Sequence, residues 1–143
     1  MGLSAIYLLD TNILSELAKR EPSAAVERRL AAHQFQCAVA APTIEELAFG
    51  IHRLPPSPKR DMLGLWLDQI LDGFVLLPYD HYCALWLGRE RVRLAASGKP
   101  APRTDGEIAA IAAVNELVLV TRNTADFANF SGLRLENWFE PAR

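Results

Sequence analysis

Four acidic residues stand where chemistry could be concentrated. Asp10 directly follows the apolar run 6–9, and Asp126 lies in TRNTADF, just after the apolar run 117–120. Glu46 in PTIEELAFGI and Asp105 in TDGEIAAIA each lie near the predicted start of a helix. Two carboxylates about 4 Å apart repel by roughly 4 kcal/mol at an effective dielectric constant of about 20. A cluster of these acids would therefore need a cation.

The donor type selects the cation. The three histidines show no metal-ligand spacing, and the two cysteines, Cys37 and Cys83, lie far apart in apolar segments, where we expect reduced, buried thiols. Carboxylate oxygens favour Mg²⁺, with Mn²⁺ as the alternative, over Zn²⁺. Because Mg²⁺ typically joins one or two carboxylates to substrate phosphates, such a cleft indicates phosphodiester chemistry.

Helix capping is a competing interpretation for the same acids. Asp10 could simply cap the helix that follows it. The segments Thr43–Glu46 and Thr104–Glu107 both fit the T-x-x-E capping box, and acids near a helix N-terminus gain about 0.3–1 kcal/mol from the helix dipole. For Glu107 the capping box is the preferred interpretation. Capping alone is a poor account of all four acids in one series of strands and helices.

Short apolar runs alternate with helical patterns along the chain. Strands buried on both faces and separated by helices predict an α/β fold, a three-layer sandwich with a central, mostly parallel sheet of four or five strands. Ligands of such sheets bind beyond the carboxyl ends of the strands, which is where Asp10 is expected. Strands are predicted at 6–9, 37–40, 74–77 and 117–120, with an edge strand at 133–135, and helices at 11–19, from 22, from 43, and at 58–72, 79–96 and 105–115.

Length and composition bound the class of protein. The 143 residues predict a single domain, 1–143. No apolar run approaches the roughly 20 residues of a membrane span, and the first five residues lack the basic segment and cleavage site of a secretory signal, so we expect a cytoplasmic protein without a membrane partner. With a net charge of −2, any surface that binds nucleic acid must be a local basic patch.

The motifs LLDTNIL, PTIEELAFGI, TDGEIAAIA and LVLVTRNTADF, in this order, resemble the PIN-domain ribonucleases, and most closely the VapC-type toxins of type II toxin–antitoxin pairs. The resemblance runs from about residue 6 to residue 130. It implies a PIN-like fold and a Mg²⁺-dependent endoribonuclease that cleaves RNA with metal-activated water and is neutralised by an antitoxin.

The resemblance implies a role for each motif residue. Asp10 and Asp105 would be the metal ligands, and Glu46 and Asp126 would complete a catalytic quartet. Supporting hydrogen bonds would come from the polar residues beside these acids: Thr11, Asn12, Thr121 and Asn123.

Two departures from the family pattern stand out. Many relatives carry an acid where this chain has Asn123, so the fourth site residue is either Asn123 or Asp126, and the number of metal ions stays open. Glu116 stands where similar sequences usually have the glycine that ends a helix. Asn115 tolerates the left-handed conformation and is expected to take over that role.

Partners are also implied. Arg122, beside the proposed site, ranks first among RNA contacts, followed by Arg103. The arginines of helix 79–96 (Arg89, Arg91 and Arg93) and Lys99 are weaker candidates, because such a run is more often a solvated face. In this family the antitoxin often inserts an arginine into the acidic cleft, where a guanidinium satisfies carboxylates. The apolar excess of helices 58–72 and 79–96 predicts a homodimer.

Two other functions compete with the nuclease. A receiver-like signalling domain also holds Mg²⁺ after its first strand, but it needs a phospho-acceptor Asp after a central strand and a Lys after a late one. Here the third strand ends in Leu77-Pro78-Tyr79, and no Lys follows Val120. A phosphatase of the haloacid dehalogenase type needs D-x-D, whereas this chain has Asp10-Thr11-Asn12, and Asn12 cannot act as a general acid.

Overall fold

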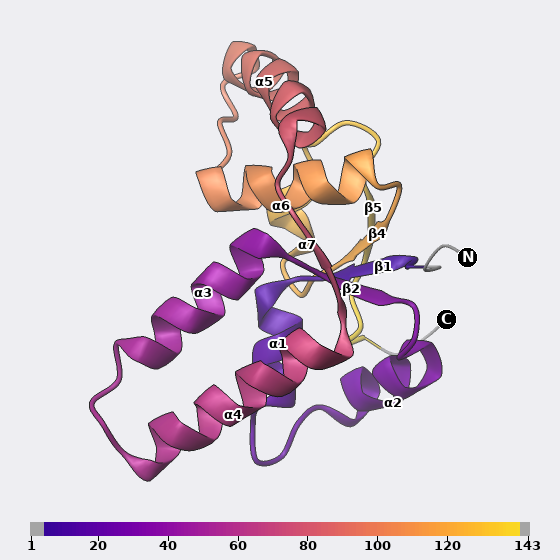
Figure 1. The fold of residues 1–143 in the computed structure, drawn as a ribbon. Coiled ribbons are helices and arrows are strands. Elements are labelled where there is room, and N and C mark those ends of the chain that lie inside the picture. Colours follow the sequence, from indigo (N-terminus) through magenta and orange to yellow (C-terminus); the bar gives the residue numbers. More distant parts are fainter. Residues whose placement is uncertain (1–4, 141–143) are drawn as a thin grey trace.

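The computed structural model describes residues 5–140. Four of the first five residues, from which we expected no secretory signal, therefore lie outside the described residues. Its centre is a five-stranded, entirely parallel sheet with the order β3-β2-β1-β4-β5 (Figure 1). The strands are β1 (Tyr7–Leu9), β2 (Cys37–Ala40), β3 (Val75–Leu77), β4 (Val118–Val120) and β5 (Arg134–Glu136). The helices are α1 (Thr11–Leu17), α2 (Ala24–His33), α3 (Ala41–His52), α4 (Pro58–Gly73), α5 (His81–Ala96), α6 (Arg103–Val114) and α7 (Thr124–Phe127).

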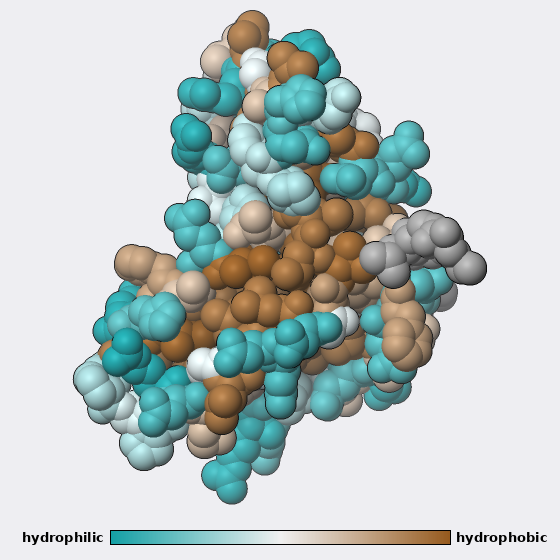
Figure 2. Space-filling model, in the orientation of Figure 1, coloured by the Kyte–Doolittle hydropathy of each residue, from teal (hydrophilic) through white to brown (hydrophobic). Residues whose placement is uncertain are grey.

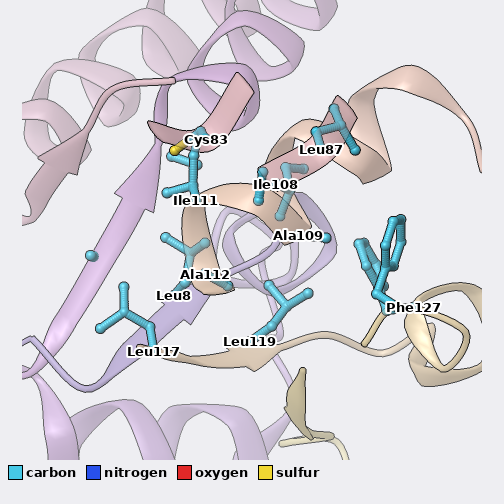
Figure 3. Close-up of a cluster of buried hydrophobic side chains, with 14 of the residues drawn as sticks. Leu8, Cys83, Leu87, Ile108, Ala109, Ile111, Ala112, Leu117, Leu119 and Phe127 are labelled. Carbon is cyan, nitrogen blue, oxygen red and sulfur yellow. The ribbon is translucent and has the colours of Figure 1, made fainter. Parts of the chain in front are cut away.

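Helices cover both faces of the sheet, which confirms the predicted three-layer α/β sandwich. Successive residues of a strand point to opposite faces. Leu8 accordingly packs with Ala38 and Leu119 against α5, α6 and α7 (Figure 3), whereas Leu9 packs with Val39 against α1 to α4. Both cysteines are free and buried, as expected.

The direction in which successive strands are added to the sheet reverses at β1. From β1 the chain builds outward through β2 to β3, then crosses back to add β4 and β5 on the other side. A parallel α/β sheet binds ligands at such a switch point, outside the carboxyl ends of the two strands concerned. Here those ends are Leu9 of β1 and Val120 of β4, which are paired in register. The receiver-like alternative would require the order 2-1-3-4-5, which this sheet does not have.

Both predicted capping boxes are wrong. Helix α3 begins at Ala41, with Ala40 as its N-cap, so Thr43 lies inside the helix. Helix α6 begins at Arg103, with Pro102 as its N-cap and no side-chain cap. Glu107 therefore caps nothing, and its carboxylate accepts a hydrogen bond from Arg103 Nε at 3.2 Å instead.

The end of α6 also differs from the prediction. Asn115 keeps a right-handed backbone (φ −92°), and Glu116 takes the left-handed conformation, with φ 56°. Asn115 still contributes to the helix end, because its side-chain amide donates to the carbonyl of Ile111 at 2.7 Å. The strained residue is thus the one that replaces the family's glycine.

Helices α5 and α6 approach each other closely beside the site. A Cβ atom built on Gly106 would lie 2.9 Å from Cδ1 of Leu87, so a side chain at this position would push the end of the Leu87 side chain aside. Figure 3 shows Leu87 above Ile108 and Ala109 in this contact. Gly106 directly follows Asp105, so this packing also fixes where the first turn of α6 presents its acid. No helix in the described part of the chain is long and apolar enough to cross a bilayer.

Candidate active site

Asp10 lies at the switch point, immediately after β1. It is the N-cap of α1, and its Oδ1 accepts a hydrogen bond from the Thr11 amide at 2.8 Å. Its own amide donates to the carbonyl of Val120, so β4 holds the backbone in place. Asp10 is only 7% exposed. Capping is thus part of its role, but burial and its further contacts show that capping is not its whole role.

Thr121 and Asn12 hold the second oxygen of Asp10. Thr121 Oγ1 donates to Asp10 Oδ2 at 2.9 Å, and Asn12 Nδ2 donates to the same oxygen at 3.2 Å. The amides of Arg122 and Asn123 complete the network by donating to Asn12 Oδ1 and Thr121 Oγ1. The network fixes the carboxylate orientation from two segments more than 100 residues apart.

Glu46 joins this group through Thr11. Thr11 Oγ1 donates to Glu46 Oε1 at 2.7 Å, linking the start of α1 to the first turns of α3. Glu46 is itself exposed, so its carboxylate can contact solvent or a ligand as well. Its negative charge contributes to the raised pKa of Asp10, although burial is the larger cause and the hydrogen bonds from Thr121 and Thr11 oppose it.

Asp105 lies in the first turn of α6 and is half-buried. Its pKa is raised to about 6, first by desolvation and then by the charges of Asp10, Asp126 and Glu46. Three acids from other elements are therefore close enough to act on the Asp105 carboxyl group. The structure brings together the four acids that the sequence predicted.

Asp126 and Asn123 occupy different places. Asp126 lies on α7 and lines the same pocket as Asp105. Asn123 precedes α7, and its hydrogen bonds in the described chain are made by its backbone: its amide donates to Thr121 Oγ1, and its carbonyl accepts from the amide of Asp126. This arrangement favours Asp126 over Asn123 as the fourth acid-site residue.

The donor set fits a hard cation held by few protein ligands. Within residues 5–140, no three His, Cys, Asp or Glu side chains are arranged as a ready-made metal cage. Mg²⁺ does not require one, since it usually keeps several waters and binds one or two carboxylates. A divalent ion between Asp10 and Asp105 would offset the repulsion that raises the pKa of Asp105.

Both arginines predicted to contact RNA are exposed. The guanidinium of exposed Arg122 stacks on the Phe139 ring, 4.3 Å from its centroid. Arg103 is exposed and pairs with Glu107. Arg93, in contrast, is not part of a merely solvated arginine face, because it forms a two-pronged ion pair with buried Glu90.

The Glu90–Arg93 pair was not predicted. Glu90 Oε1 also accepts from the Ser131 amide at 2.8 Å, and Arg93 Nη2 donates to the Asn129 carbonyl at 2.6 Å. Together these bonds tie α5 to the segment after α7. The hydrogen bond from Arg93 is the first cause of the fall in the pKa of Glu90 to about 2. A glutamate three residues before an arginine is the only sequence signal for this pair.

Comparison with known proteins agrees with this geometry. The PIN domain family model matches residues 7–133. The chain is 33% identical over 136 residues to the tRNA(fMet)-specific endonuclease VapC of Shigella flexneri, covering 92% of this chain and 97% of that protein. It is 32% identical over 141 residues to VapC ribonuclease Y4jK of Sinorhizobium fredii, covering 96% and 100%.

Solved structures show the same fold. FitAcB from Neisseria gonorrhoeae superposes with a TM-score of 0.87 at 30% identity, covering 95% of this chain and 100% of the other. DNA-bound VapBC from Salmonella typhimurium gives 0.84 at 27% identity, covering 94% and 98%. The chain therefore belongs to the PIN-domain family, among the relatives of the VapC ribonucleases.

Proposed function

We propose that this protein is a Mg²⁺-dependent endoribonuclease that acts in the cytoplasm as the toxin of a toxin–antitoxin pair. The observation that carries the proposal is the convergence of Asp10, Glu46, Asp105 and Asp126 at the switch point of the sheet. The names of the VapC relatives support RNA as the substrate.

Each acid has a role that its surroundings support. Asp10, held by three hydrogen bonds, and Asp105 would hold the divalent ion, with Mn²⁺ as a possible substitute. When bound, the ion supplies a water of lowered pKa and offsets negative charge on the phosphate. Exposed Glu46, anchored by Thr11, orients and deprotonates water. Asp126 lines the same solvent-accessible pocket as Asp105.

RNA would follow the rim of this cleft. Arg122 is the first candidate for a phosphate contact, because its backbone amide belongs to the Asp10 network and its side chain is exposed. The stack on Phe139 orders the guanidinium in advance, which lowers the entropy lost on binding. Arg103 is the second candidate, since only one exposed ion pair restrains it.

An antitoxin is the expected protein partner. VapBC, one member of which is named above as a structural neighbour, is described as a family of toxin–antitoxin systems. A cleft whose acids repel one another also suits a guanidinium from a partner, which would neutralise them and block metal and RNA together.

A second copy of the chain is the expected occupant of an apolar face. Figure 2 shows hydrophobic surface gathered across the middle of the molecule, where β3 runs between α4 and α5. Strand β3 is an edge strand with Leu76 42% exposed. The large exposed apolar side chains of the neighbouring helices are Phe49, Met62, Leu65, Tyr82, Leu85 and Val92. Because soluble monomers seldom expose so many, this face supports a homodimer.

Cleavage of RNA by the purified protein tests the proposal. Wild-type protein in Mg²⁺ should cut total RNA into fragments, and excess EDTA should stop the reaction. Expression should arrest growth, and co-expression of the neighbouring antitoxin gene should restore it. RNA cleavage that persists in EDTA, with all trace metal removed, would contradict the proposal.

A further inference from the structure

A cavity adjoins the acidic site. It has a volume of about 310 Å³ and lies between loop 99–102, the first turn of α6 and the α7 segment. Asp105 and Asp126 line it, so it opens beside Asp105, one of the two proposed metal ligands. Its size is at the lower end of the roughly 300–1,000 Å³ of small-molecule sites.

The lining combines apolar walls with a few polar groups. Pro100, Ala101, Pro102 and Ala125 supply most of the accessible apolar surface, because Leu94 and Phe130 are only 2% and 5% exposed. Lys99 and Asn129 supply donors. In the part of the chain that the structure describes, neither the Lys99 ammonium nor the Asn129 side-chain amide has a hydrogen-bond or ion-pair partner. Such donors are available to a ligand.

The wall of this cavity is rigidly supported. Arg93 donates to the carbonyl of Asn129, and Glu90 accepts from the amide of Ser131. These bonds hold both sides of Phe130, which is 5% exposed and packs against Trp86 and Phe127. A preformed wall favours a flat ligand that must be oriented accurately.

We propose that this cavity receives one nucleobase of the RNA substrate, next to the phosphate that is cut. The proposal rests on the proposed function, because it assumes that RNA is the substrate. Apolar walls suit the faces of a base, and the Asn129 amide suits the hydrogen-bonding groups of its edge. A free phosphate fits poorly, since Asp105 and Asp126 would repel it. Exposed Lys99 pairs with a backbone phosphate of the same nucleotide.

Abasic substitution tests the subsite on the unaltered protein. The cut site is first mapped on an RNA pool, and each nucleotide around it is then replaced in turn by an abasic residue. Loss of one base should slow cleavage about 10-fold to 100-fold at a single position, as the stacking contribution of one base implies. Equal cleavage of every abasic RNA would overturn the proposal.

A pair of tryptophan variants locates the effect. Ala125 lines the cavity, whereas Ala128, also exposed and at the end of α7, does not. Ala125→Trp should slow cleavage of the intact RNA at least 10-fold and should lose the sensitivity to the abasic position. Ala128→Trp should behave as the wild type. An Ala125→Trp variant that keeps the full abasic sensitivity would place the base elsewhere and overturn the subsite.

Asn129→Ala separates base recognition from charge. It should change which base is preferred at the sensitive position while leaving cleavage Mg²⁺-dependent, and an unchanged preference would count against the role of Asn129. The two proposals also fail differently. If the proposed function is wrong, the wild type cuts no RNA, and if only the subsite is wrong, the wild type cuts RNA without responding to the abasic series.

Discussion

Replacing Asp105 with Asn should stabilise the metal-free protein while it removes a metal ligand. The pKa of Asp105 is raised from an ordinary 3.8 to about 6 by burial and by three neighbouring acids. That difference corresponds to roughly 3 kcal/mol of unfavourable free energy in the ionised form. Because the side chain is half-exposed, solvent screening reduces the expected gain for Asp105→Asn to about 1–2 kcal/mol at pH 7.5.

The gain should depend on pH with a defined sign. At about pH 3, below the ordinary pKa of 3.8, the carboxyl is mostly protonated in both the folded and the unfolded chain, so wild type and variant should be nearly equally stable. As the pH rises from there to about 6 the unfolded chain ionises first, and the advantage of the variant grows. Above about pH 6 the advantage should stay constant. Urea unfolding in EDTA at about pH 3 and at about pH 7.5 measures this difference.

Adding Mg²⁺ should reverse the order. A concentration about one hundred times the dissociation constant adds about 2.7 kcal/mol to the protein that binds the ion and little to the variant, which exceeds the variant's advantage of about 1–2 kcal/mol. Asp68→Asn is the matched control, because Asp68 is exposed on α4, and it should change stability by less than about 0.5 kcal/mol in either condition. An Asp105→Asn variant that is less stable than wild type in EDTA at pH 7.5 would refute the electrostatic reasoning.

Three further substitutions test separate parts of the structure. Glu90→Gln should lower the free energy of unfolding by about 2 kcal/mol at pH 7, because it weakens charge-assisted bonds to Arg93. The loss should fade as the pH falls from 4.5 towards 2, where wild-type Glu90 itself becomes protonated. A loss that is independent of pH would contradict this. Thr121→Val removes the donor to Asp10 and should slow RNA cleavage about 10-fold to 100-fold with an unchanged circular dichroism spectrum, whereas full activity would show that the bond is dispensable. Glu116→Gly should raise stability by about 0.5–1 kcal/mol in thermal unfolding, since φ 56° is unfavourable for glutamate, and a fall in the melting temperature would argue against strain at this residue.

The sequence pattern was sufficient for the sheet because apolar runs such as Cys37–Ala40 are fully buried on both faces. It also placed Asp10 at a strand end, which the topology then turned into a position in the cleft. The hydrogen bond from Thr121 to Asp10 could be expected only as a role implied by family resemblance. This hydrogen bond depends on β4 pairing with β1. The two residues are 111 positions apart in the sequence, and the pairing of strands so far apart is set by packing of the whole domain.

Local signals were misleading where two of them competed. The Thr104–Glu107 segment fits a capping box, but Pro102, whose fixed φ suits the residue before a helix, allows α6 to begin two residues earlier. Arg93 belongs to a run of alternating arginines that resembles a solvated face. Its ion pair is visible only when the segment after α7 supplies Ser131 and Asn129 to the same cluster.

Titration of metal-free protein with Mn²⁺, followed by calorimetry, tests most directly whether Asp10 and Asp105 share one divalent ion. Wild type should bind Mn²⁺ in this cleft, and Asp10→Asn and Asp105→Asn should each weaken that binding at least 10-fold while remaining folded. Wild-type affinity in both variants would contradict the account.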